Sequence, residues 1–261
     1  MSKNKLTKPL CTGVIPLLIL CIAIYPAQVQ AQSFTNAIAT KQSKPSDQQF
    51  PDNGDPTGRR RGGTSRGDCP SLKTPITALV AGEDTDNKSF IGSTLAQYPT
   101  FWVYLPQLPN NIRSGEFVLQ NEQGSDILRT PITLPGKSGI IGISLTQNPQ
   151  LALQTNSKYH WYFNVYCDTP QKNSAYVVDA WVRRLAPTPE IQRQLNGAKS
   201  RQYNVYAANN IWYDAVNNLA QKRLTNPGTP ALAEDWGKLL KSVGLSELAS
   251  APIIQRYTVN R

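Results

Sequence analysis

The sequence predicts a mainly β protein: an immunoglobulin-like or fibronectin-like antiparallel β-sandwich followed by a C-terminal α-helical hairpin. Two observations predict this fold class. Between residues 69 and 186, short apolar runs alternate with turn residues. Beyond residue 186, apolar residues recur at steps of three and four. The 20 prolines among 261 residues also argue against a mostly helical protein, because proline breaks helix interiors.

Residues 1–31 have the pattern of a secretory signal peptide. Three lysines precede a mostly apolar run from Leu10 to Ile24, and Val29-Gln30-Ala31 offers small residues at a cleavage site. The run is too short for the hydrocarbon core of a bilayer, about 30 Å thick, so we expect no transmembrane span after cleavage. We expect an exported protein, either periplasmic or extracellular.

Residues 32–68 contain almost no large apolar side chains and are rich in Gln, Ser, Asp, Pro and Gly. A segment of this composition buries too little apolar surface to offset the entropy lost on ordering. We therefore expect a disordered linker that ends in a basic turn at Gly58-Arg59-Arg60-Arg61-Gly62-Gly63.

Seven strands are expected in the β-sandwich domain, residues 69–186. No helix-length segment lies between them, which favours antiparallel pairing over a parallel sheet. The runs 116–121 and 126–134 are expected to form a hairpin across Gln123-Gly124. The expected strands are 76–80, 100–105, 116–121, 126–134, 139–145, 159–167 and 176–184.

The strand at 159–167 carries a local signature. Leu153 precedes Tyr159 by six positions, which resembles the tyrosine corner of immunoglobulin-like sandwiches, where the phenol bonds the backbone upstream. Alternation then divides the strand into two faces. The expected core face carries Tyr159, Trp161, Phe163, Val165 and Cys167, and the other face carries His160, Tyr162, Asn164 and Tyr166.

Two cysteines remain once the signal peptide, with Cys11 and Cys21, is removed. Cys69 and Cys167 then most often pair in an exported chain, and we expect a disulfide between them. Two free thiols are the alternative.

Residues 187–250 predict a helical hairpin. Thr188 and Pro189 begin a first helix that stops near Gly197, and a second runs from about 203 to 224. Thr229-Pro230 begins a third, which closes at Gly244. Residues 251–261 are expected to be a C-terminal tail.

The richest candidate binding surface is aromatic. Tyr162, Tyr166 and Trp181 are expected to project away from the core, where exposed rings stack on sugars or anchor proteins. In the favoured alternative, the helical hairpin folds back and covers these three side chains.

A basic cluster of Arg59, Arg60, Arg61 and Arg66 is the candidate anion contact, for example for an anionic polysaccharide. The alternative is a solubilising turn. Nucleic acid is not expected as a partner of an exported chain without a recognised nucleic-acid-binding fold.

Other motifs carry little chemistry. Gly63–Gly67 matches G-x-S-x-G but lacks the flanking strand and helix, and Asp84–Lys88 only begins like a calcium loop. Asp179, in an apolar strand, is expected to pair with Arg183 or Arg184. With one histidine in the chain, we predict no metal site, no cofactor and no catalytic residue.

Several blocks of sequence follow one another in a fixed order. They are Gly58–Gly63 through Asp68–Pro70, Tyr98–Pro106, Glu116–Gln120, Leu134–Gly136 with Gly139–Ile140, Tyr159–Cys167, Ala180–Arg184 and Ile211–Ala215. Together, over roughly residues 58–250, they resemble a cyanobacterial family of exported proteins that is catalogued as a domain of unknown function, number 928. The resemblance implies an exported envelope protein, with no activity to transfer.

Taken together, these observations predict a non-enzymatic binding or interaction module of the cell envelope, with an envelope protein or polysaccharide as its partner. The alternatives are a hydrolase that acts on cell-wall or extracellular polysaccharide, and a structural accessory to a secretion or surface assembly.

Overall fold

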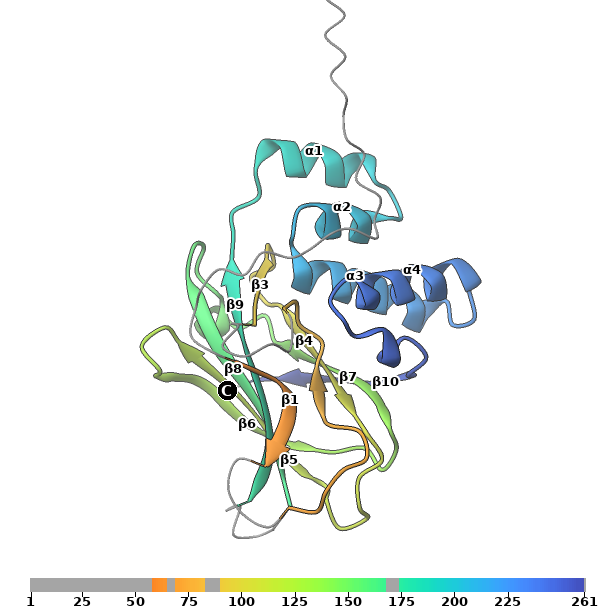
Figure 1. The fold of residues 1–261 in the computed structure, drawn as a ribbon. Helices are drawn as coiled ribbons and strands as arrows, with labels where there is room; N and C mark the ends of the chain where they lie inside the picture. The colour runs from red at the N-terminus through yellow and green to blue at the C-terminus, as the bar shows by residue number, and fades with distance from the viewer. Residues whose placement is uncertain (1–57, 65–68, 83–89, 168–173, 261) are drawn as a thin grey trace, which may run out of the picture. The chain divides into compact units, whose positions relative to one another are not determined.

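The structure, a computed structural model, describes residues 58–64, 69–82, 90–167 and 174–260. These residues form a mainly β fold in which ten strands make one mixed sheet and four α-helices lie near the C-terminus (Figure 1). The strands are β1 (Arg59–Thr64), β2 (Thr77–Ala78), β3 (Ile91–Thr94), β4 (Thr100–Leu105), β5 (Ser114–Asn121), β6 (Asp126–Thr133), β7 (Gly139–Leu145), β8 (Lys158–Tyr166), β9 (Ala175–Arg184) and β10 (Ile253–Val259).

The strand order is β10-β7-β4-β2-β1-β9-β8-β5-β6, and β3 pairs with β9 off this path. The pairs β10–β7 and β3–β9 are parallel, whereas the other pairs are antiparallel. All seven strands expected from the sequence are present, and the hairpin across Gln123-Gly124 is β5–β6.

The two halves of the sheet pack face to face. The ring of Phe101 on β4 lies 5.1 Å from that of Phe117 on β5 and 5.2 Å from that of Trp161 on β8, between ring centroids. At the two ends of the sheet, the Tyr257 hydroxyl on β10 donates a 2.7 Å hydrogen bond to the carbonyl of Thr133 on β6. The sheet is therefore nearly closed into a barrel.

This topology does not confirm an immunoglobulin-like sandwich. The difference comes from three strands that the sequence pattern did not predict. β1 lies in the segment expected to be linker and joins the two halves of the sheet, because it pairs with β2 and with β9. β3 and β10 add the parallel pairs, and β10 occupies the segment expected to be a tail.

The tyrosine corner is nevertheless present as a local contact. The backbone N–H of Gln154 donates a 2.8 Å hydrogen bond to the hydroxyl of Tyr159, whose ring is buried. The alternation along β8 is also as predicted: Tyr159, Trp161, Phe163 and Val165 are buried, and the residues between them are partly exposed.

The helices are α1 (Pro189–Gly197), α2 (Gln202–Ala208), α3 (Trp212–Thr225) and α4 (Pro230–Lys241). The single helix expected from about 203 to 224 is therefore two. It breaks at Asn210, whose φ of 57° is left-handed and ends α2. Among the described residues, no helix is both long and apolar enough to cross a membrane.

Candidate functional site

The side chains that point away from the core on four neighbouring strands make up the candidate site. The register places Val118 of β5 beside Tyr162 of β8, and Tyr162 beside Asp179 of β9, so alternate residues form continuous rows across the sheet. We call this surface the outer face. It consists of Glu116, Val118, Gln120, Asp126, Arg129, His160, Tyr162, Asn164, Tyr166, Asp179 and Trp181.

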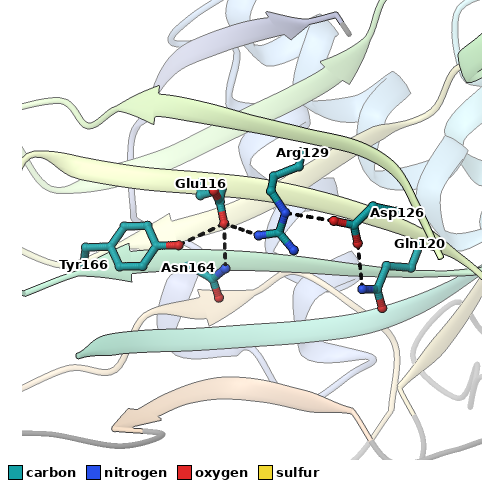
Figure 2. A network of polar contacts seen from close by, with 6 residues as sticks. All are labelled: Glu116, Gln120, Asp126, Arg129, Asn164 and Tyr166. Atoms are coloured by element: carbon teal, nitrogen blue, oxygen red, sulfur yellow. Dashed lines mark hydrogen bonds and ion pairs between the residues drawn. The ribbon is translucent and has the colours of Figure 1, made fainter. Parts of the chain in front are cut away.

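Glu116 is the centre of a polar network on the outer face (Figure 2). Its side chain is only 10% exposed, and its Oε2 accepts hydrogen bonds from Arg129 Nη1 at 2.5 Å and from the Tyr166 hydroxyl at 2.9 Å. Asn164 Nδ2 lies 3.5 Å from the same oxygen. The network thus joins three strands, because Glu116 belongs to β5, Arg129 to β6, and the other two residues to β8.

Arg129 extends this network to Asp126. Its Nε donates to Asp126 Oδ2 at 2.8 Å, and Gln120 Nε2 donates to the other carboxylate oxygen at 2.8 Å. The hydrogen bond from Gln120 and that from Arg129 lower the pKa of Asp126. The third guanidinium nitrogen, Nη2, has no partner among the described residues, and the Arg129 side chain is 49% exposed.

Burial and the hydrogen bond to Glu116 raise the pKa of Tyr166 to about 12. Its phenol is therefore protonated at neutral pH and acts as a donor to the carboxylate. The network offers fixed hydrogen-bonding groups and a half-buried aromatic ring next to them.

A second chain of hydrogen bonds runs through the one histidine. His160 Nε2 lies 2.8 Å from Asp179 Oδ2, and the Tyr162 hydroxyl lies 2.7 Å from His160 Nδ1. In a neutral imidazole ring, Nε2 then donates to the carboxylate and Nδ1 accepts the phenol proton. Burial, and then the charge of Asp179, raise the pKa of Tyr162, so its phenol stays protonated.

The expected pairing of Asp179 with Arg183 or Arg184 is therefore wrong. Arg183 and Arg184 lie four and five residues along the same strand, whereas His160 lies on the neighbouring strand and is diagonally adjacent to Asp179. Arg184 instead donates a 2.5 Å hydrogen bond to the carbonyl of Leu153.

Trp181 is part of the outer face, but it is buried, with 6% exposure. Its indole stacks on the ring of His160, with 4.3 Å between centroids and 18° between planes. Its Nε1 has no hydrogen-bond partner among the described residues. Trp181 thus packs against His160 and restricts the orientation of its ring, while Tyr162 and Tyr166 remain partly exposed.

The helical hairpin does not take the place that we expected over these aromatic residues. The first turn of α3 instead reaches the core: Trp212 Nε1 donates to the carbonyl of Leu79 at 2.8 Å, and Tyr213 packs on Phe101, with 5.6 Å between ring centroids. The apolar side of α3 packs there, against β3 and β4 (Figure 1).

The structure divides the predicted arginine cluster. Arg59 is exposed, but Arg60 is buried and Arg61 pairs with Glu247 at 2.7 Å. Alternation along β1 causes this division, because successive residues of a strand point to opposite faces. Arg66 lies outside the described residues, as do residues 1–57, Ser65 of the G-x-S-x-G match and the calcium-like loop at 84–88.

The predicted disulfide between Cys69 and Cys167 is confirmed, with 5.5 Å between the Cα atoms. It joins the end of β8 to the segment before β2. The Tyr176 hydroxyl donates to the carbonyl of Pro70 beside it. Across the described ranges, no three His, Cys, Asp or Glu side chains gather in a way that could hold a metal ion.

Sequence reasoning missed Glu116, Gln120, Asp126 and Arg129. For three of them the signal was present in the predicted β5–β6 hairpin: alternation places Glu116 and Gln120 on the side opposite Phe117 and Leu119, and pairing with β5 brings Arg129 to the same side. Asp126 joins them because the register shifts between Leu119 and Gln120, which alternation does not predict. Pairing that hairpin with the strand at 159–167 would have brought Glu116 to Asn164 and Tyr166.

The family model of the Domain of Unknown Function (DUF928) matches residues 61–253. The chain belongs to the DUF928 family. The match covers most of the outer face, both cysteines and helices α1 to α4 of this DUF928 protein. A search of curated proteins finds no match for it.

Solved structures similar to the DUF928 protein include a lytic polysaccharide monooxygenase of Jonesia denitrificans, with 16% identity and a TM-score of 0.26 over 39% of this chain and 63% of that one. Another is the fn3 domain of the human collagen alpha-1(XX) chain, with 13% identity and a TM-score of 0.23 over 49% and 94%. A third is a β-glucuronidase of Bacteroides uniformis, with 10% identity and a TM-score of 0.29 over 71% and 27%. The chain spans less than two thirds of both enzymes, and these scores are too low to carry any property over to it.

Proposed function

We propose that the protein is an exported, non-enzymatic binding module of the cell envelope and that the outer face is its binding surface. The observation that carries the proposal is the network around Glu116 and Arg129. It holds polar groups in fixed positions next to partly exposed tyrosines. Pre-organised groups lose little entropy when a ligand binds, and surfaces that combine aromatic and polar side chains are typical of recognition.

The Tyr162–His160–Asp179 chain supports binding rather than turnover. It has the order of a nucleophile, a base and an orienting carboxylate, but burial and the charge of Asp179 raise the pKa of Tyr162, which disfavours the phenolate that would attack a substrate. The phenol is therefore a hydrogen-bond donor at neutral pH, and these hydrogen bonds fix the rings of Tyr162 and His160 in place.

Export is supported by the pattern of residues 1–31 and by the disulfide, since such bonds persist in oxidising compartments. Fractionation of cells that express the full chain tests this part of the proposal. Recovery of the protein from the cytosol with both cysteines reduced would contradict it.

Co-sedimentation with envelope fragments tests the binding function. The purified protein is expected to sediment with fragments from the cells that produce it, and the double variant Arg129→Ala/Tyr162→Ala is expected to stay in solution. Arg193→Ala is the matched control, because Arg193 lies on α1, is 76% exposed and, among the described residues, pairs only with Glu190 on its own helix. Equal sedimentation of all three proteins, or of none, would refute the proposal.

A further inference from the structure

We infer that the ligand of the outer face is a neutral carbohydrate chain rather than a charged polymer. This inference rests on the proposed binding function and names the chemical class of its ligand. Three properties of the outer face carry it: the pairing of its charged side chains with one another, the hydrogen-bonding groups that remain open, and the spacing of its two tyrosines.

The charges on the outer face are already paired with one another. Glu116 and Asp126 share the guanidinium of Arg129, and Asp179 bonds His160. Arg59, which is exposed, lies opposite Asp179 in the register of β1 and β9. A strongly anionic or cationic ligand would have to displace these partners, whereas a neutral one leaves them in place.

The basic cluster that suggested an anionic polysaccharide does not offset this balance. Arg60 donates to backbone carbonyls inside the protein, and Arg61 pairs with Glu247. Arg60 and Arg61 therefore have structural roles.

The groups of the network that remain open include a donor and two acceptors. Arg129 Nη2 is the donor, and the amide oxygens of Gln120 and Asn164 are the acceptors. These oxygens are open because Gln120 Nε2 faces Asp126 and Asn164 Nδ2 faces Glu116 (Figure 2). A sugar hydroxyl both donates and accepts, so it can satisfy groups of either kind. Each of these side chains is positioned by a carboxylate before any ligand arrives.

The tyrosines add ring surface at a suitable spacing. Tyr162 and Tyr166 are partly exposed on the same side of β8, and their hydroxyls bond His160 and Glu116, so a ligand meets chiefly their rings. Four residues of a strand span roughly 13 Å, at about 3.3 Å per residue. That length exceeds one sugar ring, so both tyrosines together suit an extended chain of sugars.

A hollow continues the face past Tyr166. It has a volume of about 470 Å³, and its lining includes Arg113, Ser114, Pro131 and Thr133. Ser114 pairs with Tyr166 and with Thr133 in the sheet, so the hollow adjoins the network. A chain that lies across the two tyrosines would reach it with its next unit.

Chemical treatment of the envelope fragments tests this inference. Periodate cleaves the vicinal diols of sugars, whereas a protease removes protein partners. Sedimentation of the purified protein is expected to be lost after periodate and kept after protease. It is expected to change less than twofold in 1 M NaCl, because the Debye length of about 3 Å at this concentration screens ionic contacts and leaves stacking and neutral hydrogen bonds intact.

Two variants locate the site within the same assay. Arg129→Ala and Gln120→Ala are each expected to weaken binding to protease-treated fragments at least tenfold, and Arg193→Ala is expected to leave it unchanged. The thermal midpoint of each variant shows whether the protein is folded.

Each remaining outcome contradicts the inference in a distinct way. Loss of binding after protease identifies a protein partner, and loss in salt identifies a charged polymer. In both cases the proposed binding function stands if Arg129→Ala still weakens the contact. Binding that survives periodate overturns the inference, and the absence of binding to untreated fragments overturns both proposals.

Discussion

Arg60 lies inside the protein, although Arg59 beside it is exposed. Its Nη1 donates to the carbonyls of Gly82 and Val243, both at 2.6 Å, and its guanidinium lies 5.2 Å from the ring centroid of Phe90. Val243 lies just past the end of α4, where the helix dipole favours a positive charge. One side chain therefore ties β1 to a loop and to a helix end.

Replacing Arg60 with Met is expected to lower the free energy of unfolding by about 3 kcal/mol, because buried carbonyls lose a charged donor. Arg59→Met is the matched control, with an expected change within about 0.5 kcal/mol for an exposed site. Urea unfolding of both variants measures the difference. Equal stability of the two variants would show that the buried contacts of Arg60 contribute nothing.

Asp214 makes the stability of the protein depend on pH. It lies in the first turn of α3, and its Oδ2 accepts from Thr94 Oγ1 at 2.6 Å and from the Leu95 N–H at 3.0 Å. Burial raises the pKa of Asp214 to about 6 from an ordinary value of 3.8, although these hydrogen bonds oppose the shift. The folded state therefore favours the protonated carboxyl, and the stability that this group contributes is complete below pH 3.8 and is lost as the pH rises through about 6.

The variant Asp214→Asn keeps an acceptor and does not ionise. Relative to the natural chain, it is expected to gain stability between pH 4 and pH 7.5, by up to about 3 kcal/mol for a shift of about two pKa units. Urea midpoints of both proteins at the two pH values give this difference, in which the other carboxylates cancel. A difference that is independent of pH would contradict the raised pKa.

One phenol of α3 bonds two strands of the sheet at once. The Tyr213 hydroxyl accepts a 2.7 Å hydrogen bond from Trp161 Nε1 on β8 and donates one of 2.9 Å to the carbonyl of Trp181 on β9. All of these atoms are buried. The helix thus holds β8 and β9, two of the four strands of the outer face, from their core side.

Tyr213→Phe is expected to lower the free energy of unfolding by about 2 kcal/mol, because it leaves a buried indole N–H and a buried carbonyl without partners. Tyr206→Phe on α2 is the control, since Tyr206 is only partly buried. Thermal unfolding and tryptophan fluorescence report the change. A loss no greater than that of the control would mean that packing alone places α3.

The strands that were predicted correctly are those with the strongest sequence patterns. β4 and β7 begin and end at the predicted residues, because each is an apolar run with turn-forming residues such as proline and glycine on either side. β1 was missed because an Arg- and Gly-rich strand has the composition of a linker, and β3 because it has only four residues. The site was predicted in part: alternation placed Tyr162 and Tyr166 on the outer face, but the partners of His160 depend on strand register, which no local pattern contains.

The disulfide between Cys69 and Cys167 closes a long loop that contains most of the sheet. Cys69 and Cys167 are 98 residues apart, and β2 to β8 lie between them. A cross-link over a loop of this length restricts the unfolded chain much more than the folded one. It also fixes the end of β8 beyond Tyr166.

Reduction of the disulfide, or the variant Cys69→Ser/Cys167→Ser, is expected to lower the free energy of unfolding by about 4–5 kcal/mol. Urea unfolding under oxidising and reducing conditions measures the effect, and the double variant should not respond to the reductant. Equal midpoints in both conditions would show that the unfolded chain is compact without the bond.

The last strand of the chain pairs in parallel with β7, which is made more than a hundred residues earlier. Until β10 is in place, the backbone groups of β7 on that side have no partner, and the gap that Tyr257 bridges stays open. A partly folded chain, or one truncated before β10, therefore exposes an unpaired apolar strand, which favours pairing with another copy and aggregation.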